Sequence, residues 1–311
     1  MTEQEIMQEW LEPSTLYVSV CCTAYNNEAF IVEALDSILS QKTTFPFEII
    51  VRDDASTDNT ASIIQTYQEK FPNIIKPILE KENQYSQGVK ALPVTFAQAQ
   101  GNYIAICQAD DYWNDTTKLQ QQIDFLEANS DYVITYHDCE AVTKDGIIHA
   151  DLGGAKRDLT AQELQRCTPI YTLTACFRNV IQNYPKEHYS ARIADLFLWS
   201  MLGAYGKGKY LENIKYARYR IHAGGIFSQK TKKERYEMAM STDATLFIYY
   251  SHRSNKELSQ YFKHKLVNDW ILSENTRILL KDIAFYHWER FKRKVKGKFN
   301  KYIKKNLDRF N

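Results

Sequence analysis

The chain has 311 residues, of which 44% are hydrophobic and 25% are charged. This composition excludes a disordered chain and leaves room for one large globular domain with an elaboration. The net charge is +1, but residues 289–311 carry ten Lys or Arg residues and only two acidic ones, so the body of the chain is mildly acidic. An acidic body argues against a nucleic acid partner, and none is expected.

The sequence also predicts a cytoplasmic protein. Its acidic N-terminus lacks the basic start and apolar run of a secretory signal. No stretch reaches the roughly 18 apolar residues of a membrane-spanning helix. The six cysteines show no CxxC spacing, which argues against a zinc site or a disulfide framework and favours buried free thiols in a reducing compartment.

The first half of the chain alternates short apolar runs with amphipathic stretches. Strands are predicted at residues 16–22, 47–51, 73–79, 103–107 and 132–136. Helices are predicted between them, at residues 30–39, 61–71, 87–100 and 117–129. Because strands alternating with helices of this length indicate βαβ units, the predicted fold class is α/β, with a mainly parallel sheet flanked by helices.

Beyond residue 139 the pattern is looser. A strand is predicted at residues 171–177, a helix at 194–204 and a further strand at 210–220. Residues 230–311 are mainly helical in pattern. The chemistry is therefore expected before this helical C-terminal extension.

Two of the predicted strands are followed by paired aspartates, Asp53-Asp54 and Asp110-Asp111. Adjacent carboxylates repel each other and, when desolvated, need a cation or several hydrogen-bond donors. In an open parallel sheet, ligands bind beyond the carboxyl ends of the strands, where the strand order reverses. A double aspartate can also simply mark a turn, which is the better explanation for one pair alone. Two pairs at such strand ends favour a binding crevice.

The polar groups at this edge suit a nucleotide ligand. Thr23 and Tyr25 follow the first strand, and a tyrosine ring can stack on a base. Asp54 can accept a hydrogen bond from a base imide or a ribose hydroxyl. The hard carboxylate oxygens of Asp110 or Asp111 suit Mg²⁺ or Mn²⁺, which would bridge a diphosphate.

Three stretches resemble the family 2 glycosyltransferases of the GT-A type. They are VSVCCTAYNNE at residues 18–28, IVRDDASTDNT at 50–60, and GNYIA at 101–105 followed by QADDYW at 108–113, which resembles the family's metal-binding DXD region. The resemblance covers about residues 16–228. It implies a GT-A catalytic domain over residues 1–228, with a donor half at about 16–138 and an acceptor half at about 139–228, followed by a helical region at 229–311.

The resemblance also implies the substrates and the cofactor. They are a nucleotide-diphosphate sugar donor, UDP-linked, a carbohydrate or lipid-linked saccharide acceptor, and Mn²⁺ or Mg²⁺. Gln108 departs from the acidic residue that many relatives carry there: it can hydrogen-bond a ribose hydroxyl but brings no charge. Metal binding is therefore expected to depend on Asp110 and Asp111, between which the sequence does not choose.

Asp195 opens an apolar helical stretch. An aspartate at this position in the resembling enzymes is the general base that deprotonates the acceptor hydroxyl, and the sugar is transferred with inversion at the anomeric carbon. The flanking Ala194 and Leu196 depart from the Gly-Asp-Trp common among relatives. The alternative is that Asp195 only caps the helix.

The stretch YRIHAGG at residues 219–225 resembles a Y-R-x-H-x-G-G element of the same family. It implies His222 as a metal or diphosphate ligand, and Arg220 as a partner of phosphate or a brace for the loop. A structural histidine is the competing explanation. Lys90 can offer charge to the phosphates, although a solvated helix lysine would look the same.

The tail from residue 288 combines an apolar helical face with many basic residues. This pattern is typical of a helix that lies on an anionic membrane surface; the alternative is that its apolar face packs on the domain. Membrane contact would suit a lipid-linked acceptor at the inner face of the cytoplasmic membrane.

The predicted function is an inverting, metal-dependent glycosyltransferase of bacterial cell-surface polysaccharide or lipopolysaccharide synthesis. The absence of G-x-G-x-x-G and of G-x-x-x-x-G-K-[ST] argues against a dehydrogenase and a P-loop NTPase. The alternative from another class is a non-catalytic nucleotide-sugar-binding or membrane-scaffold protein with the same fold, and Gln108 is the best argument for it.

Overall fold

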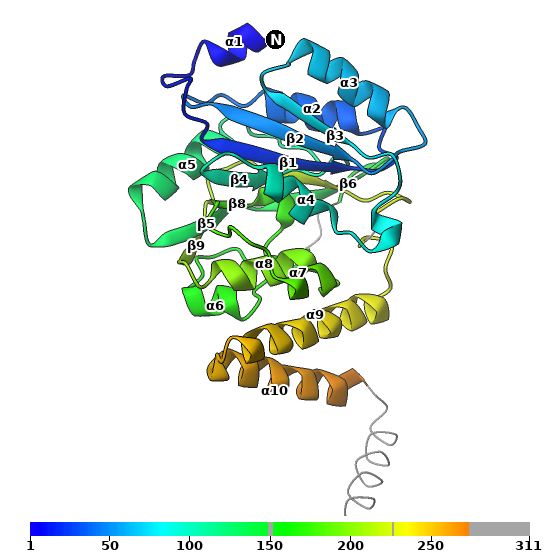
Figure 1. Cartoon of the computed structure of the whole chain (residues 1–311), viewed down its shortest axis with the longest axis vertical. Coiled ribbons are helices and arrows are strands. Elements are labelled where there is room, and N and C mark those ends of the chain that lie inside the picture. Colours follow the sequence, from blue (N-terminus) through cyan, green and yellow to red (C-terminus); the bar gives the residue numbers. More distant parts are fainter. Residues whose placement is uncertain (149–151, 226, 274–311) are drawn as a thin grey trace, which may run out of the picture.

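The computed structural model describes residues 1–148, 152–225 and 227–273, with side chains through residue 268. A seven-stranded sheet forms its centre (Figure 1). All neighbouring strands in it are parallel except one, β8, which is antiparallel to both of its neighbours. The predicted mainly parallel α/β sheet is thereby confirmed. In spatial order the strands are β3 (Ile75–Leu79), β2 (Phe47–Asp53), β1 (Val18–Ala24), β4 (Tyr103–Ile106), β8 (Cys176–Arg178), β5 (Tyr132–Tyr136) and β9 (Lys207–Tyr210).

The strand order reverses beside β1. The chain builds β1, β2 and β3 outward in one direction and then returns to place β4 on the other side of β1. Val18 of β1 pairs with Phe47 of β2 and with Tyr103 of β4, so the three strands start in register. Their carboxyl ends therefore meet at one edge, which is where open α/β sheets bind ligands.

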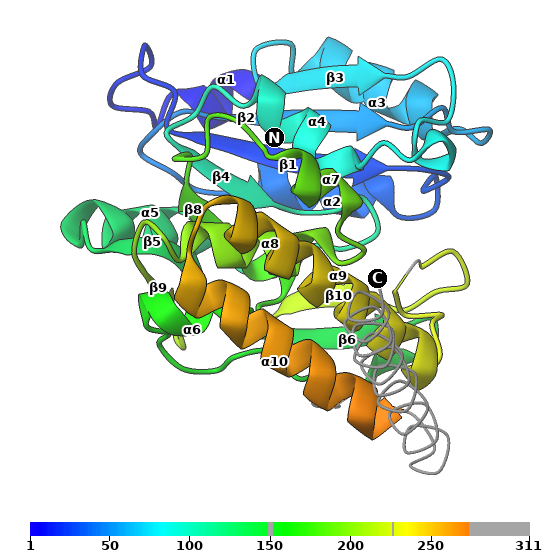
Figure 2. The ribbon, with the colours of Figure 1, turned by 60° about the horizontal axis from the view of Figure 1, so that its bottom comes forward.

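Helices cover both faces of the sheet (Figure 2). Alternation along each strand creates the two apolar faces: Cys22 and Val51 lie in one buried cluster, while their neighbours Cys21 and Ile50 lie in the other. The first cluster is covered by α1 (Glu3–Met7), α2 (Ile31–Leu39), α3 (Thr60–Lys70) and α5 (Lys118–Ala128). The second is covered by α4 (Ala91–Gln98) and α8 (Ala194–Leu202).

A smaller sheet contains β10 (Ala217–Arg220), β6 (Cys139–Thr143) and β7 (Gly146–Ile148), in that order. The strand predicted at residues 210–220 is wrong in extent. Its start belongs to β9 of the large sheet and its end is β10 of the small one, because Glu212 and Asn213 form a turn between them. The small sheet brings β10 beside the loop after β4, through a bridge between Tyr112 and Arg218.

Short elements account for the other differences from the predicted pattern. The strand predicted at residues 171–177 divides into the 3-10 turn η2 (Thr172–Thr174) and β8. The helix predicted from residue 87 starts only at Ala91, because Gly88, at φ +86°, ends the 3-10 turn η1 (Tyr85–Gln87). The helices α6 (Ala161–Gln165) and α7 (Lys186–Ser190) have five residues each, which is too short for a helical period to show in the sequence.

The described part of the C-terminal extension, through residue 273, is a hairpin of two helices, α9 (Lys232–His252) and α10 (Lys256–Ser273). α9 lies between α10 and the layer of α7 and α8 (Figures 1 and 2). Leu246, Tyr250, Leu258 and Phe262 of the hairpin are buried in the same cluster as the side chains of α8. The hairpin therefore shares its buried core with α8.

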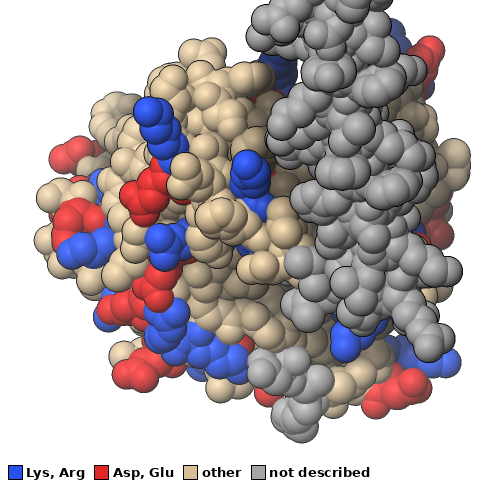
Figure 3. Space-filling model, turned by 90° about the horizontal axis from the view of Figure 1, so that it is seen from below, with Lys and Arg blue, Asp and Glu red and all other residues tan. Residues whose placement is uncertain are grey.

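None of the described helices is both long enough and apolar enough to cross a membrane. Seen from the side of the hairpin, the described surface carries basic and acidic side chains next to each other (Figure 3). The predicted membrane-binding tail, residues 288–311, lies outside the described residues.

Candidate active site

The loops after β1, β2 and β4 are joined to one another at the edge where the strand order reverses. The amide of Ala109 donates to the carbonyl of Thr23 at 3.1 Å, and the amide of Asp54 donates to the carbonyl of Ala24 at 3.0 Å. Tyr25 projects from this edge with 48% of its surface exposed. Thr23 and Tyr25 thus lie where a nucleotide would approach the sheet.

In the loop after β1, Asn26 adopts the left-handed backbone conformation, at φ +52°. An asparagine tolerates this conformation better than most residues. Its amide donates to Oγ of Ser56, and the amide of Thr57 donates to its Oδ1 at 2.8 Å. The loops after β1 and β2 therefore form one rigid rim.

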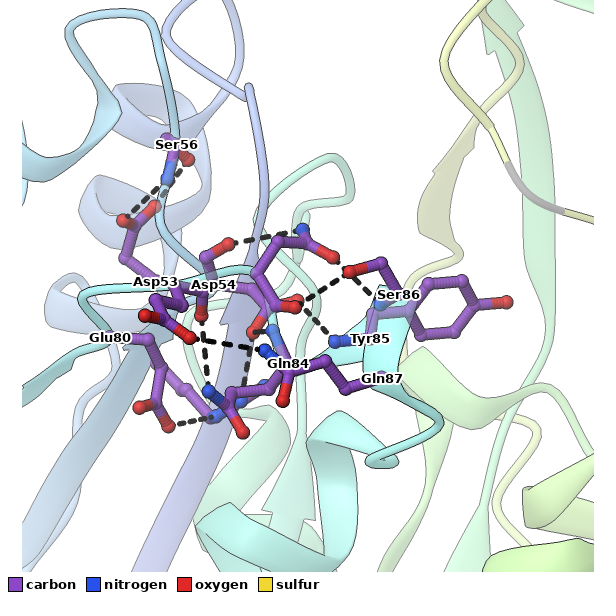
Figure 4. A network of polar contacts seen from close by, with 11 residues as sticks. Asp53, Asp54, Ser56, Glu80, Gln84, Tyr85, Ser86 and Gln87 are labelled. Atoms are coloured by element: carbon purple, nitrogen blue, oxygen red, sulfur yellow. Dashed lines mark hydrogen bonds and ion pairs between the residues drawn. The ribbon is translucent and has the colours of Figure 1, made fainter.

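The aspartates after β2 are both satisfied by donors of the chain itself (Figure 4). Asp53 accepts from the amide and hydroxyl of Ser56. Asp54, which is 4% exposed, accepts from Nη2 of Arg52 at 2.9 Å and from the amides of Gln84 and Tyr85 at 3.0 and 2.9 Å. These contacts anchor the loop before α4. The role of Asp54 as an acceptor for a base or ribose stays a prediction.

The aspartates after β4 point in different directions. Oδ2 of Asp110 lies 3.1 Å from Nε2 of His222, and both side chains are partly exposed. Asp111 is 1% exposed, and its Oδ1 accepts from the amide of Arg220 at 2.8 Å. Burial and the neighbouring charge of Asp110 raise the pKa of Asp111 well above its usual range. The geometry therefore favours Asp110 over Asp111 as a ligand for a cation from solvent.

His222 is held in place by Phe30, whose ring centre lies 4.7 Å from that of the imidazole. A carboxylate and an imidazole that converge at 3.1 Å are donors that Mn²⁺ accepts, and Mg²⁺ takes the carboxylate. Among the described residues no three His, Cys, Asp or Glu side chains gather as a metal site. Asp110 and His222 are thus the described side chains that would hold a divalent ion at this edge, with one carboxylate and one imidazole ligand.

Arg220 braces this pair. Its Nη1 donates to the carbonyl of Asp110 at 2.6 Å, and its Nη2 pairs with Glu33 of α2. The guanidinium lies over the rings of Phe30 and Tyr112, at 4.6 and 5.1 Å from their centres. The structure thus gives Arg220 the bracing role, while its predicted contact with phosphate stays a prediction.

Asp195 lies in the first turn of α8. Its Oδ1 accepts from the amide of Leu196 at 2.8 Å, and its Oδ2 accepts from the hydroxyl of Thr172 in η2. Burial raises the pKa of Asp195 above its usual value, while these hydrogen bonds oppose the rise. A carboxylate with a raised pKa is a stronger base once it is ionised.

The structure adds Trp113, whose position the sequence analysis did not interpret. Its indole Nε1 donates to the carbonyl of Leu173 in η2 at 2.8 Å. Thr172, the residue before Leu173 in η2, donates its hydroxyl hydrogen bond to Asp195. The loop that carries Asp110 is thereby tied to the turn that holds Asp195. A buried tryptophan seven residues beyond the end of β4 belongs to no periodic pattern that would have identified this role.

Lys90 is the N-cap residue of α4, half-buried at the start of the helix. Burial and the nearby charge of Arg192 lower its pKa. Gln108 is partly exposed in the loop after β4, where its carbonyl accepts from the amide of Asp111 at 3.0 Å. Each of these two side chains is thus open to a ligand from solvent.

Comparison with known proteins gives consistent results. The model of the family described as "Glycosyl transferase family 2" matches residues 19–183. An Escherichia coli protein named UDP-Glc:alpha-D-GlcNAc-diphosphoundecaprenol beta-1,3-glucosyltransferase WfaP is 30% identical over 70% of this chain and 82% of its own. The uncharacterized protein Rv1520 of Mycobacterium tuberculosis is 29% identical over 89% of this chain and 87% of its own.

Among solved structures, S. aureus TarS 1-349 in complex with UDP-GlcNAc has a TM-score of 0.58. The match covers 84% of this chain and 74% of that chain at 21% sequence identity. This likeness confirms the predicted GT-A type of fold.

Proposed function

Because the chain belongs to glycosyl transferase family 2, and is therefore a glycosyltransferase, we propose that it moves a sugar from a UDP-linked donor to a hydroxyl group of a saccharide acceptor. The transfer proceeds with inversion and depends on a divalent metal. The observation that carries the proposal is the convergence of Asp110 and His222, 3.1 Å apart, at the edge where the strand order reverses.

The donor lies across the ends of β1, β2 and β4. Tyr25 stacks on the base, and Thr23, Asp54 and Gln108 offer hydrogen-bonding groups to the base and ribose. Mn²⁺ or Mg²⁺, held by Asp110 and His222, would neutralise the charge that develops on the leaving diphosphate. Asp111 accepts a hydrogen bond from the backbone amide of Arg220 and does not bind the ion directly.

Lys90 contributes positive charge to the phosphates. Neither it nor Arg192 takes part in an ion pair with another described residue, and burial and the nearby charge of Arg192 lower the pKa of Lys90. Two neighbouring cations repel each other, so an anion between them lowers the energy of both. A phosphate group is the anion that this reaction supplies.

Asp195 is the base. Its ionised carboxylate takes the proton of the acceptor hydroxyl as the oxygen attacks the anomeric carbon. The new carbon–oxygen bond forms as the bond from that carbon to the diphosphate oxygen breaks, and the nucleoside diphosphate departs with the bonding electrons. Attack from the face opposite the leaving group inverts the configuration.

The relatives favour an acceptor of the bacterial cell surface. WfaP is named for transfer to a saccharide on diphosphoundecaprenol, and TarS was solved with UDP-GlcNAc. We place this chain in cell-surface polysaccharide synthesis, with residues 1–228 as the catalytic domain and residues 229–311 as a helical region. Residues 288–311 would hold it on the inner face of the cytoplasmic membrane. The second candidate, a non-catalytic nucleotide-sugar-binding protein, is favoured by one observation, the uncharged Gln108.

The test has two stages. A panel of nucleotide sugars is screened by thermal shift with and without Mn²⁺, and a donor raises the melting temperature through binding to the folded state. Release of nucleoside diphosphate from the selected donor is then measured for the wild type and for Asp195→Asn. Metal-dependent turnover in the wild type, with donor binding but no turnover in the variant, supports the enzyme. Donor binding without turnover in both proteins would support the binding protein instead.

A further inference from the structure

The carboxylate of Asp195 is held by a turn from another part of the chain. Oδ2 accepts from the hydroxyl of Thr172, which lies 23 positions earlier in η2. The other oxygen accepts from the amide of Leu196. The contact with Leu196 is local to α8, whereas the contact with Thr172 fixes the side chain of Asp195 relative to η2.

The turn η2 is itself clamped from two sides. Nε1 of Trp113 donates to the carbonyl of Leu173 at 2.8 Å, and Nε2 of Gln122 donates to the carbonyl of Thr174 at 2.9 Å. Leu173, Thr174, Trp113 and Gln122 are all buried. A turn whose carbonyls are bound by buried donors has little freedom to move.

The clamp begins in the same loop as the proposed metal ligand. Trp113 follows Asp110 by three positions, and its own amide donates to Oγ of Ser37 at 3.1 Å. The path from the loop of Asp110 to Asp195 therefore runs through the buried Trp113 and Leu173 and the partly exposed Thr172. Such a path fixes the distance between the leaving group and the base.

We infer that Thr172 is a positioning residue, whose hydroxyl orients the carboxylate of Asp195 toward the acceptor and stabilises its ionised form. This inference rests on the proposed role of Asp195 as the base. The hydroxyl is a donor here because an ionised carboxylate only accepts. A valine at position 172 has nearly the same shape but leaves Oδ2 without this partner.

The pH profile also depends on whether other titratable groups lie around α8. From α7, Nε2 of His188 donates to the carbonyl of Ala194 at 3.1 Å, and burial lowers the pKa of His188 to about 4. Beyond α6, burial raises the pKa of Cys167 to about 12. From α9, Asp243 is paired with Lys265 of α10. His188 and Cys167 therefore stay neutral over most of the range from pH 5 to 9.

The experiment compares Thr172→Val with Thr172→Ser and measures kcat, the KM for the donor, and kcat/KM from pH 5 to 9. Loss of a hydrogen bond to a charged group raises the pKa of a carboxylate by roughly one unit. We expect the acidic limb of the Thr172→Val profile to move up by about one pH unit. We also expect kcat to fall at least tenfold at pH 6 while the donor KM changes less than twofold. Thr172→Ser keeps a hydroxyl that can donate to Asp195, so its pH profile should retain the acidic limb of the wild type.

Two outcomes would contradict this account. A wild-type pH profile in Thr172→Val, with Asp195→Asn inactive, overturns the inference and leaves the proposed function standing. Wild-type turnover in Asp195→Asn overturns the assigned base itself. Thermal melting checks that each variant is folded, and Thr172→Ala tests the same missing hydroxyl if the valine does not fit.

Discussion

Nε2 of His222 lies 3.1 Å from Oδ2 of Asp110, although 112 positions separate the two residues in the chain. The small sheet makes this contact possible, since the bridge between Tyr112 and Arg218 brings β10 beside the loop after β4. Arg220 then fixes the loop by binding the carbonyl of Asp110. The two proposed metal ligands thus follow strands of different sheets. The hydrogen bond from Arg220 to the carbonyl of Asp110 holds them together without a metal ion.

The first prediction concerns this pair. His222→Ala removes one of the two protein ligands, so we expect the Mn²⁺ concentration for half-maximal activity to rise at least tenfold, by analogy with the loss of supporting contacts at metal sites. Donor turnover titrated with Mn²⁺ measures this, and calorimetric Mn²⁺ binding checks it without catalysis. His264→Ala, at an exposed position of α10, is the matched control. An unchanged Mn²⁺ requirement in His222→Ala would remove His222 from the site.

The second prediction concerns Asp54. Asp54→Asn weakens the ion pair with Arg52, whose side chain is fully buried, and replaces an acceptor of two loop amides by an amide group. Loss of one partner of a buried pair costs about 3 kcal/mol, which urea unfolding measures. The loop at residues 83–88 should also become more susceptible to limited proteolysis. Asp124→Asn, on the exposed side of α5, should change stability by less than about 0.5 kcal/mol. Equal stability of both variants would contradict the anchoring role.

The sequence predicted the donor side of the molecule well, because local patterns determine it. The runs before Asp53 and Asp110 are short and mainly apolar, so the strands and the polar ends that follow them are visible without a structure. The different directions of Asp110 and Asp111 were not predictable. They depend on β10, whose residues come about a hundred positions later and form a long-range bridge.

The acceptor side was predicted less completely for a similar reason. η2 has only three residues, and its position depends on buried donors from Trp113 and Gln122. Three residues are too few to show a period. A backbone carbonyl accepts a hydrogen bond whatever side chain its residue carries, so the sequence does not reveal such a contact. The roles of Thr172 and Trp113 therefore became visible only in the folded structure.

The third prediction concerns pH and Lys118, which is fully buried with its Nζ 4.2 Å from the ring centre of Trp113 and 2.5 Å from Oε1 of Gln122. Burial lowers the pKa of Lys118 to about 8 from 10.5. As the pH falls from 10.5 to 8, the unfolded chain takes up a proton that the folded chain does not. Folding is therefore disfavoured progressively over that range, and the full penalty persists below pH 8.

Lys118→Met removes this penalty. We expect the difference in unfolding free energy, variant minus wild type, to increase by about 2 kcal/mol as the pH falls from 10 to 7. Urea unfolding at both pH values measures it. The substitution also removes contacts of Lys118, but their contribution to the unfolding free energy is the same at both pH values and cancels in the comparison. A difference that does not change with pH would show that Lys118 titrates normally in the folded protein.

The fourth prediction concerns the C-terminal hairpin. Leu246 of α9 is fully buried in the cluster that contains α8, and Oγ1 of Thr242 accepts from the amide of Ile193 at the start of α8. Leu246→Ala should lower the unfolding free energy by about 2–5 kcal/mol through the cavity that it leaves. Ile248→Ala, two positions along the same helix and 45% exposed, should have a much smaller effect.

The same measurement shows whether the hairpin unfolds separately. Shared burial predicts a single transition in which fluorescence and circular dichroism coincide. An early transition confined to helix content in Leu246→Ala would mean that the hairpin is an independent unit.

The position of β8 has a consequence for how the protein is made. This strand is formed by residues 176–178, yet it occupies the gap between β4 and β5, whose residues leave the ribosome much earlier. Until β8 arrives, the nascent chain presents β4 with one side unpaired, and an unpaired strand is a template for association with other chains. The large sheet therefore cannot be completed before residues 176–178 have been translated, and a product truncated ahead of residue 176 would be prone to aggregate.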